Sequence, residues 1–493
     1  MLNGPLVLGD RPLRYDEVVA VADGRRVILG EAAQARMKAS RATLENLLAR
    51  GDAIYGLTTG VGAIKTVRVT ASQQEAFQTL LLRAHRVGHG ELASSRFVRA
   101  AMLVRAAGLA VGVAGVRPEV ADAFCRALDV PVSPRVHQFG SIGQADLSQL
   151  AEIGLALIGH GSDGAALVAA GYRPVVLGPR EAHAIVNGNA FSVGMTCVAL
   201  DAALRALRAL DVSAALSIEA LTGNVDALHP AVAAVRPHAG TAETIGRIRG
   251  LLRGGALLTG GRPARAIQDP LAFKVVPQTH GGAYQSLAHL ERALAIELAS
   301  SGDSPIVIAD EDRAISTGNH DITPVAIAVD YARLGLAQAI TIAGERVQKL
   351  LDSAFTGLPT GLRADPAAPD DGLAILAIGA ASLAAEARLL AHPVTLEQPT
   401  SGIAAGIEDR ITMAPAGARR LHEMAGLTVR LAAVELTCAA QAVDLRGTAG
   451  ELGDGTARAY AATRRSIAFT AAGQSCEGDL DRLEQWLASD AAP

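Results

Sequence analysis

The sequence predicts a mainly α-helical protein, built as a bundle of long helices with a loop-rich N-terminal region and a few short strands. The first observation is periodicity: several stretches, some of them longer than 20 residues, carry apolar residues at helical spacings of three and four. The second is composition, because 50% of the 493 residues are hydrophobic while only 3% are aromatic and 51 are glycine. A core of small and aliphatic side chains lets helices approach closely on several sides, as in a bundle.

The individual elements follow from local patterns. Helical periodicity covers residues 151–160, 191–221, 282–300, 323–352 and 374–392. A short amphipathic helix is expected around Trp486, after a flexible glycine-rich segment that follows Arg446. Strand-like segments are short, as at residues 25–30 and 173–178.

Three regions follow one another along the chain without a clean linker. Residues 1–200 are loop-rich, residues 201–390 form a central long-helix bundle, and residues 391–493 form a C-terminal helical region. Because a single chain would leave some apolar helix faces exposed, we expect copies of the chain to share the bundle as a homo-oligomer.

Composition also excludes several classes of function. The net charge is −4 and no stripe of basic residues occurs, so nucleic acid is not an expected partner. The four cysteines are far apart and no residues have the spacing of metal ligands, so neither a disulfide framework nor a metal site is predicted. The N-terminus lacks the pattern of a signal peptide and no run of 18 apolar residues occurs, so we expect a cytoplasmic protein without a membrane span.

Several motifs occur together in one order. They are YGLTTGVGAIK at residues 55–65, EALTGNVDALHPAVAAVRPHAG at 219–240, QDPLAFKVVPQTHG at 268–281, SGDSPIVIADEDRAISTGNHDITPVAIAVD at 301–330, and a long block at 399–446. In order and spacing, the chain resembles the histidine and aromatic amino acid ammonia-lyases over most of residues 1–447. The resemblance implies an almost all-α homotetramer with a central helical bundle, whose active sites are lined by loops from three subunits and bind a small-molecule substrate.

The resemblance also shows what is missing. These lyases use an electrophilic prosthetic group, MIO, made by cyclisation and dehydration of an internal Ala-Ser-Gly in the sequence GSVGASGDLAPL. The corresponding stretch here, residues 140–150, reads GSIGQADLSQL and is one residue shorter. A glycine nitrogen must attack the preceding carbonyl and a serine must lose water, and Gln144-Ala145 offers neither. We therefore predict that MIO is absent, that no cofactor replaces it, and that Asp146 caps the helix that follows.

Two other X-Ser-Gly triplets, Ser300-Ser301-Gly302 and Thr400-Ser401-Gly402, lie in loops that serve other roles in the family.

Three residues are candidates for catalysis, two because they match the family and one because it departs from it. Tyr55 matches the tyrosine that abstracts the β-proton of the substrate, although a buried structural tyrosine would give the same pattern. Glu408 matches a carboxylate that assists at the amine end, although it also fits a surface salt bridge. His320 stands where the family has a phenylalanine, and the next residue, Asp321, replaces a histidine, so new polar groups enter the site.

Four further residues are assigned to substrate binding. His85 falls where the histidine-specific lyases carry a pocket histidine, and a satisfied structural histidine is the alternative. Asn187 and Gln278 match pocket amides. Lys274 replaces an arginine that clamps the carboxylate, so the charge is kept but the two-pronged donor geometry is lost.

Three functions remain open at this point. The first is an MIO-independent lyase or isomerase that performs acid–base elimination or isomerisation on a small carboxylate-bearing substrate, with Tyr55 or His320 as the base. The second is a non-catalytic scaffold or ligand-binding homologue. The third is a genuine histidine or aromatic ammonia-lyase or aminomutase whose electrophile forms in an unfamiliar way.

Overall fold

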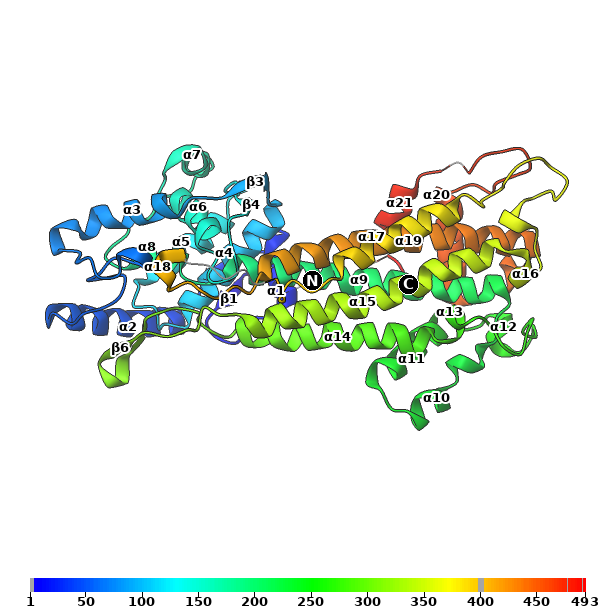
Figure 1. Cartoon of the computed structure of the whole chain (residues 1–493), viewed down its shortest axis with the longest axis horizontal. Coiled ribbons are helices and arrows are strands. Elements are labelled where there is room, and N and C mark those ends of the chain that lie inside the picture. Colours follow the sequence, from blue (N-terminus) through cyan, green and yellow to red (C-terminus); the bar gives the residue numbers. More distant parts are fainter. Residues whose placement is uncertain (1–3, 398–402, 477, 490) are drawn as a thin grey trace. The chain divides into compact units, whose positions relative to one another are not determined.

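The computed structural model describes residues 4–397, 403–476, 478–489 and 491–493, and most of this chain is helical (Figure 1). The mainly α-helical class predicted from the sequence is confirmed. The α-helices of the chain are α1 Tyr15–Ala22, α2 Glu31–Ala49, α3 Gln74–His85, α4 Ser95–Ala110, α5 Pro118–Leu128, α6 Leu147–Leu157, α7 Gly161–Ala169, α8 Glu181–Val186, α9 Ala190–Leu221, α10 Pro230–Val235, α11 Ala239–Leu251, α12 Ala256–Thr259, α13 Leu271–Lys274, α14 Val276–Glu297, α15 Thr323–Leu351, α16 Ser353–Thr356, α17 Leu376–Leu390, α18 Ile403–Gly406, α19 Ala414–Arg446, α20 Asp454–Ser466 and α21 Leu480–Ala488.

The remaining elements are short 3₁₀ helices and strands. The 3₁₀ helices are η1 Gly62–Ile64, η2 Ala71–Gln73, η3 Val225–Leu228, η4 Ala309–Glu311, η5 Thr360–Leu362 and η6 Ala449–Glu451. The strands are β1 Leu6–Leu8, β2 Val27–Leu29, β3 His89–Leu92, β4 His137–Phe139, β5 Ile306–Ile308 and β6 Arg313–Ile315. They form three two-stranded sheets, with β1 parallel to β2, and with the β3–β4 and β5–β6 pairs antiparallel.

The five long helical patterns all correspond to helices: α6, α9, α14, α15 and α17 contain most of the predicted ranges. Two local expectations are wrong. Residues 173–178 form no strand, because the segment pairs with no other strand. Its backbone is bonded instead to the Leu157 carbonyl, through Val175 N–H (3.1 Å), and to the side chains of Arg126 and Arg117. The segment after Arg446 is not simply flexible, because α20 forms there and buries small residues on one face, including Thr456, Ala459 and Thr463.

By its internal contacts the chain divides into two compact units. The first comprises residues 1–201, 290–329 and 393–419, and the second comprises residues 202–289, 330–392 and 420–493. In the first unit α4 packs against α1 and α5, while α6 packs against α3, α7 and α8. In the second unit α11 packs against α10 and α20, and α20 packs against α21.

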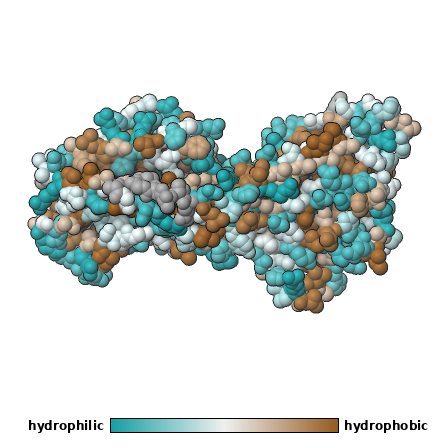
Figure 2. All heavy atoms as spheres, viewed as in Figure 1, coloured by the Kyte–Doolittle hydropathy of each residue, from teal (hydrophilic) through white to brown (hydrophobic). Residues whose placement is uncertain are grey.

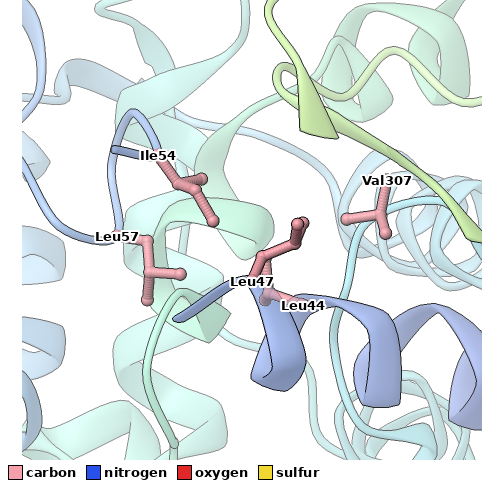
Figure 3. Packing of buried hydrophobic residues seen from close by; sticks show 5 residues of the cluster. All are labelled: Leu44, Leu47, Ile54, Leu57 and Val307. Carbon is pink, nitrogen blue, oxygen red and sulfur yellow. The ribbon is translucent and has the colours of Figure 1, made fainter. Parts of the chain in front are cut away.

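A small apolar cluster fixes the loop that follows α2 in the first unit. Figure 3 shows its five buried members, which are Leu44 and Leu47 of α2, Ile54 and Leu57 of the loop, and Val307 of β5. Burial of each aliphatic side chain contributes roughly 1.5–3 kcal/mol relative to exposure. Because Ile54 and Leu57 are both held, the intervening Tyr55 has a defined position.

Three helical stretches are long and apolar enough, by length and composition alone, to cross a membrane: Glu181–Leu221, Thr323–Leu351 and Ala414–Arg446. The sequence did not predict these stretches, because none of them contains an uninterrupted run of 18 apolar residues. In their most apolar windows, 78%, 61% and 83% of the residues are buried inside the protein itself. On the face seen in Figure 2, hydrophobic residues lie interspersed with hydrophilic ones. Packing within the chain therefore accounts for much of their apolar character.

In the second unit a buried ion pair joins the helices α15 and α19. Arg346 of α15 and Glu435 of α19 are both fully buried, and the guanidinium donates to both carboxylate oxygens at 2.6 and 2.9 Å. The hydroxyls of Ser213 and Ser217 on α9 each donate to the same carboxylate at 2.7 Å. The buried Glu435 carboxylate thus has both a cation and two hydroxyl donors, and a buried charge needs such partners to be tolerated.

The buried pair gives a stability prediction. Arg346→Met leaves the Glu435 carboxylate buried without its cation, so we expect the free energy of unfolding to fall by roughly 3–5 kcal/mol. The matched control is Arg253→Met, which breaks an exposed pair with Asp454 (3.1 Å) and should cost less than about 1 kcal/mol. Urea unfolding at one fixed protein concentration measures both, and equal losses in the two variants would contradict the prediction.

Candidate active site

A cavity of about 430 Å³ in the first unit brings together most of the residues that the sequence singled out. Those lining it are Tyr55, His85, Asn187, His320 and Glu408. Its wall also includes several residues that were not predicted as site residues: Val61, Gly62, Lys65, Gln144, Ala145, Leu147, His183, Val186, Ser304, Ser316, Thr317, Ile407, Asp409 and Arg410. Residues far apart in the sequence therefore meet around one polar hollow.

Tyr55 lies in the loop held by the apolar cluster. Its hydroxyl oxygen accepts a hydrogen bond from the Gly62 backbone N–H at 2.8 Å. Its ring meets the His183 ring edge-on, with ring centres 5.5 Å apart and an angle of 75° between the planes. The hydrogen bond from Gly62 uses one lone pair of the phenol oxygen, so a second lone pair remains for a bound molecule.

His85 is the last residue of α3, and its protonation can be inferred from its partner. Nδ1 lies 2.8 Å from the Leu81 carbonyl oxygen one helical turn earlier. Because a carbonyl can only accept, Nδ1 carries the hydrogen and Nε2 of the neutral ring is an acceptor.

Asn187 and His320 are positioned by the chain around α8. The Asn187 amide donates to Ser304 O at 2.8 Å, and the amide of the nearby Asn189 donates to His320 O. In the part of the chain that the structure describes, Nδ1 of His320 is buried and has no hydrogen-bond partner. His320 therefore retains unused hydrogen-bonding capacity beside the cavity.

The loop before α6 departs from what the sequence suggested for Asp146. Asp146 stands at the N-terminal cap position of α6 but makes no side-chain cap bond there. Its fully buried carboxylate instead accepts from the Ser141 hydroxyl and from both the backbone N–H and the hydroxyl of Ser192, all at 2.7 Å. Burial raises the pKa of Asp146, and the hydrogen bonds from Ser192 and Ser141 oppose that rise. The prediction that Asp146 caps α6 is wrong, because the carboxylate holds the first turn of α9.

Gln144 ties the same loop to the segment that carries His320. Its amide donates to the Asp321 carboxylate at 2.7 Å, and the two residues also form an isolated antiparallel bridge. Asp321 accepts in addition from the Thr323 backbone N–H at 2.8 Å and lies 3.6 Å from Arg410. Burial raises the pKa of Asp321, but the hydrogen bonds of Thr323 and Gln144 and the charge of Arg410 outweigh it, so the pKa is lowered. Asp321 therefore acts as an anchor for the loop.

The loop does not fit the prosthetic group of the resembling lyases. Gln144 and Ala145 stand where three residues are needed, and neither has a hydroxyl to lose. The backbone N–H of the next residue, Asp146, donates a hydrogen bond to Gly188 O at 2.8 Å. This nitrogen is therefore already used in a backbone hydrogen bond. Of the two other triplets, Ser301 donates to Asp303 at 2.8 Å and does not line the cavity, while residues 400–402 lie outside the described residues.

The cavity wall also carries two cationic side chains that were not among the predicted site residues. Arg410, whose guanidinium donates to the Thr323 hydroxyl at 3.0 Å, and Lys65 both line the wall. A carboxylate-bearing molecule would meet these cations. Among the residues described, no group of three or more His, Cys, Asp or Glu side chains is arranged to hold a metal ion.

Two of the predicted substrate-binding residues, Lys274 and Gln278, are not part of the first unit. Both belong to the second unit, Lys274 at the end of α13 and Gln278 in α14, and both side chains are exposed. Lys274 donates to Gln268 at 2.9 Å. Neither residue lines the cavity formed by the first unit of the same chain.

Comparison with known proteins gives the family. Residues 13–465 match the family model of the aromatic amino acid lyases. The chain is 34% identical to a histidine ammonia-lyase of Symbiobacterium thermophilum over 485 residues, covering 96% of this chain and 94% of that protein. A histidine ammonia-lyase of Treponema denticola is 32% identical over 497 residues, covering 99% and 97%. The chain belongs to the aromatic amino acid lyase family, whose members are enzymes.

Solved structures agree with this assignment. The ergothionase of Treponema denticola, solved in complex with desmethyl-ergothioneine sulfonic acid, superimposes with a TM-score of 0.91 at 28% identity over 98% of both chains. The histidine ammonia-lyase of Trypanosoma cruzi gives a TM-score of 0.89 at 25% identity over 99% of this chain and 94% of that one.

The Gln144–Asp321 bridge gives the next prediction. Asp321→Ala removes a charge-assisted hydrogen bond worth roughly 1.5–3 kcal/mol, so backbone amides of residues 140–147 should exchange with deuterium about tenfold faster or more. The control is Asp310→Ala, an exposed carboxylate in the same unit. Hydrogen-exchange mass spectrometry measures both, and unchanged exchange in Asp321→Ala would mean that the bridge does not hold the loop.

Proposed function

We propose that this protein is an MIO-independent lyase or isomerase that performs acid–base elimination or isomerisation on a small carboxylate-bearing substrate. One observation carries the proposal. The electrophile's place in the loop is taken by Gln144-Ala145, which is built into the bridge to Asp321, while acid–base side chains still surround the cavity. Such a site retains the means to move protons without the means to capture an amine.

The residues around the cavity suggest distinct roles. Tyr55 in its ionised form, or His320 in its neutral form, takes the proton from the substrate carbon, and the two side chains enter from different loops. Arg410 and Lys65 hold the carboxylate, and Glu408 acts at the opposite, leaving-group end. The electron pair of the broken C–H bond either expels the leaving group, which is an elimination, or shifts the double bond. In the second case the protonated base returns its proton to another carbon, which is an isomerisation.

We further propose that the active unit is a homotetramer with shared sites. The α15 residues Ile327, Tyr331 and Leu334 are 53%, 48% and 45% exposed and follow one helix face at i, i+4 and i+7. An exposed apolar stripe of this kind favours burial against another copy of the chain. Lys274 and Gln278 would then reach the cavity of a neighbouring copy.

A second candidate is a histidine ammonia-lyase with an electrophile formed elsewhere. It is favoured by the two relatives at 34% and 32% identity, which are histidine ammonia-lyases. It requires release of ammonia from histidine, and it requires a carbon electrophile that borohydride reduces.

Proton abstraction can be tested without knowing the substrate. The protein is incubated in D₂O with 2-amino, 2-hydroxy and α,β-unsaturated acids, and loss of C–H signals and release of ammonia are followed by NMR and an ammonia assay. We expect exchange or elimination with at least one acid, no ammonia from histidine, and a rate that borohydride treatment leaves unchanged. In Tyr55→Phe the rate should fall by roughly a hundredfold or more, because general-base catalysis contributes that much.

The matched control is Tyr460→Phe, because Tyr460 lies on α20 in the second unit, where it bonds to Asp444. It should keep the native rate. Ammonia from histidine that borohydride abolishes would support the second candidate instead. Ligand-induced thermal stabilisation without any exchange would indicate a binding protein.

A further inference from the structure

We propose that His183 is a fixed, neutral hydrogen-bond donor that binds a substrate oxygen on which negative charge develops. This deepens the proposed function and rests on it, because it names the substrate class: an acid whose reacting C–H lies next to a carbonyl or carboxylate carbon. Neither the motifs nor the residue types in the sequence singled out His183.

The position of His183 is set by the fold. It lies in α8, is 5% exposed, and lines the cavity beside the ring of Tyr55. Gly56, the neighbour of Tyr55, packs directly against the imidazole, and a Cβ at Gly56 would collide with the ring nitrogen Nδ1. Gly56 also has φ +69°, so both its conformation and the close approach require glycine.

Arg180 fixes which ring nitrogen carries the hydrogen. The fully buried guanidinium donates to Ala114 O at 3.1 Å and to Pro305 O at 2.7 Å, and its Nη1 lies 2.8 Å from Nδ1 of His183. Burial lowers the pKa of Arg180 to about 10, so the group still carries its charge at neutral pH. Because a guanidinium has donors only, Nδ1 must be the acceptor, and the hydrogen of the ring lies on Nε2.

The surroundings also keep the ring uncharged. Burial lowers the pKa of His183 well below its usual value, and the neighbouring charge of Arg180 lowers it further. The pKa is lowered although Glu408 and Asp409 line the same cavity. Two carboxylates on adjoining segments are paired with arginines, Glu181 with Arg117 and Asp303 with Arg105. His183 is therefore a donor that neither takes up nor gives away a proton across the neutral range.

A donor of this kind suits a reaction that lacks a covalent electrophile. When Tyr55 or His320 takes the proton, the C–H electron pair moves toward the adjacent carbonyl carbon and the oxygen gains negative charge. That oxygen accepts a hydrogen bond from Nε2–H of His183, and no proton leaves the ring. Neutral, preorganised donors aimed at a developing oxyanion contribute a large share of rate enhancement in other enzymes.

The tautomer is tested on the native protein. Solid-state ¹⁵N NMR of the histidine-labelled chain, with the His183→Gln spectrum subtracted, isolates this ring among the 12 histidines. We expect a protonated Nε2 and a bare Nδ1 at both about pH 5 and about pH 8. A hydrogen on Nδ1, or a charged ring at about pH 5, would overturn the proposal whatever the enzyme catalyses.

The oxygen-binding role is tested with the nitronate of 3-nitropropionate, a carboxylate whose charged nitronate oxygens resemble the developing oxyanion. We expect it to shift the Nε2 resonance, to bind at least about tenfold more weakly to His183→Phe, and to bind His183→Gln, which keeps an N–H donor, nearly as well as the native protein. No shift and equal binding by His183→Phe would overturn the role.

The same variants separate this inference from the proposed function. If an acid exchanges its proton, His183→Phe should lower kcat by roughly 10²–10³, with a smaller change in KM, and His183→Gln should restore most of the rate. Absence of exchange with every acid would refute the proposed function, while the tautomer and the nitronate measurements still decide the role of His183.

Discussion

The hydrogen bond from the Gln144 amide to the Asp321 carboxylate links the two loops on which the site depends. One loop leads into α6 and ends at Asp146, whose buried carboxylate holds the start of α9 through Ser192. The other carries His320 and leads into α15. Asp321 is kept charged by Thr323, Gln144 and Arg410, so the bond is charge-assisted and stronger than a neutral one. With this bond in place, His320 and Arg410 come to the same cavity as Tyr55.

Near this hydrogen bond, the position of the ring hydrogen on two histidines is set by partners that can only accept or only donate. The Leu81 carbonyl can only accept, so His85 offers a bare nitrogen, whereas the Arg180 guanidinium can only donate, so His183 offers a hydrogen. Two imidazoles on one cavity wall thus have opposite hydrogen-bonding character. A pocket with separated acceptor and donor functions suits proton transfer next to an oxygen, and this is the physical basis of the proposed chemistry.

The sequence predicted the parts of the molecule that depend on repeated local patterns. The long helices were located because each buries residues at regular spacing, and Tyr55, His85, Asn187, His320 and Glu408 were placed together by resemblance. His183 was missed although it lies four residues before Asn187, because the meaning of a histidine depends on Arg180, whose contacts are tertiary. The same reason applies to Lys65, whose place in the cavity wall depends on the loops that meet there. The helix α20 was missed because its buried face consists of small residues that look flexible in sequence.

A loop at residues 140–150 that carries no electrophile keeps its unmodified mass, and mass spectrometry of the peptide measures this. The purified, full-length protein is digested under mild conditions and the peptide containing Gln144 and Ala145 is measured by high-resolution mass spectrometry, together with the peptide containing Ser301. We expect unmodified masses for both peptides, and an intact chain at its sequence mass. A chain lighter by two water molecules, with the loss located in any of its peptides, would contradict this expectation.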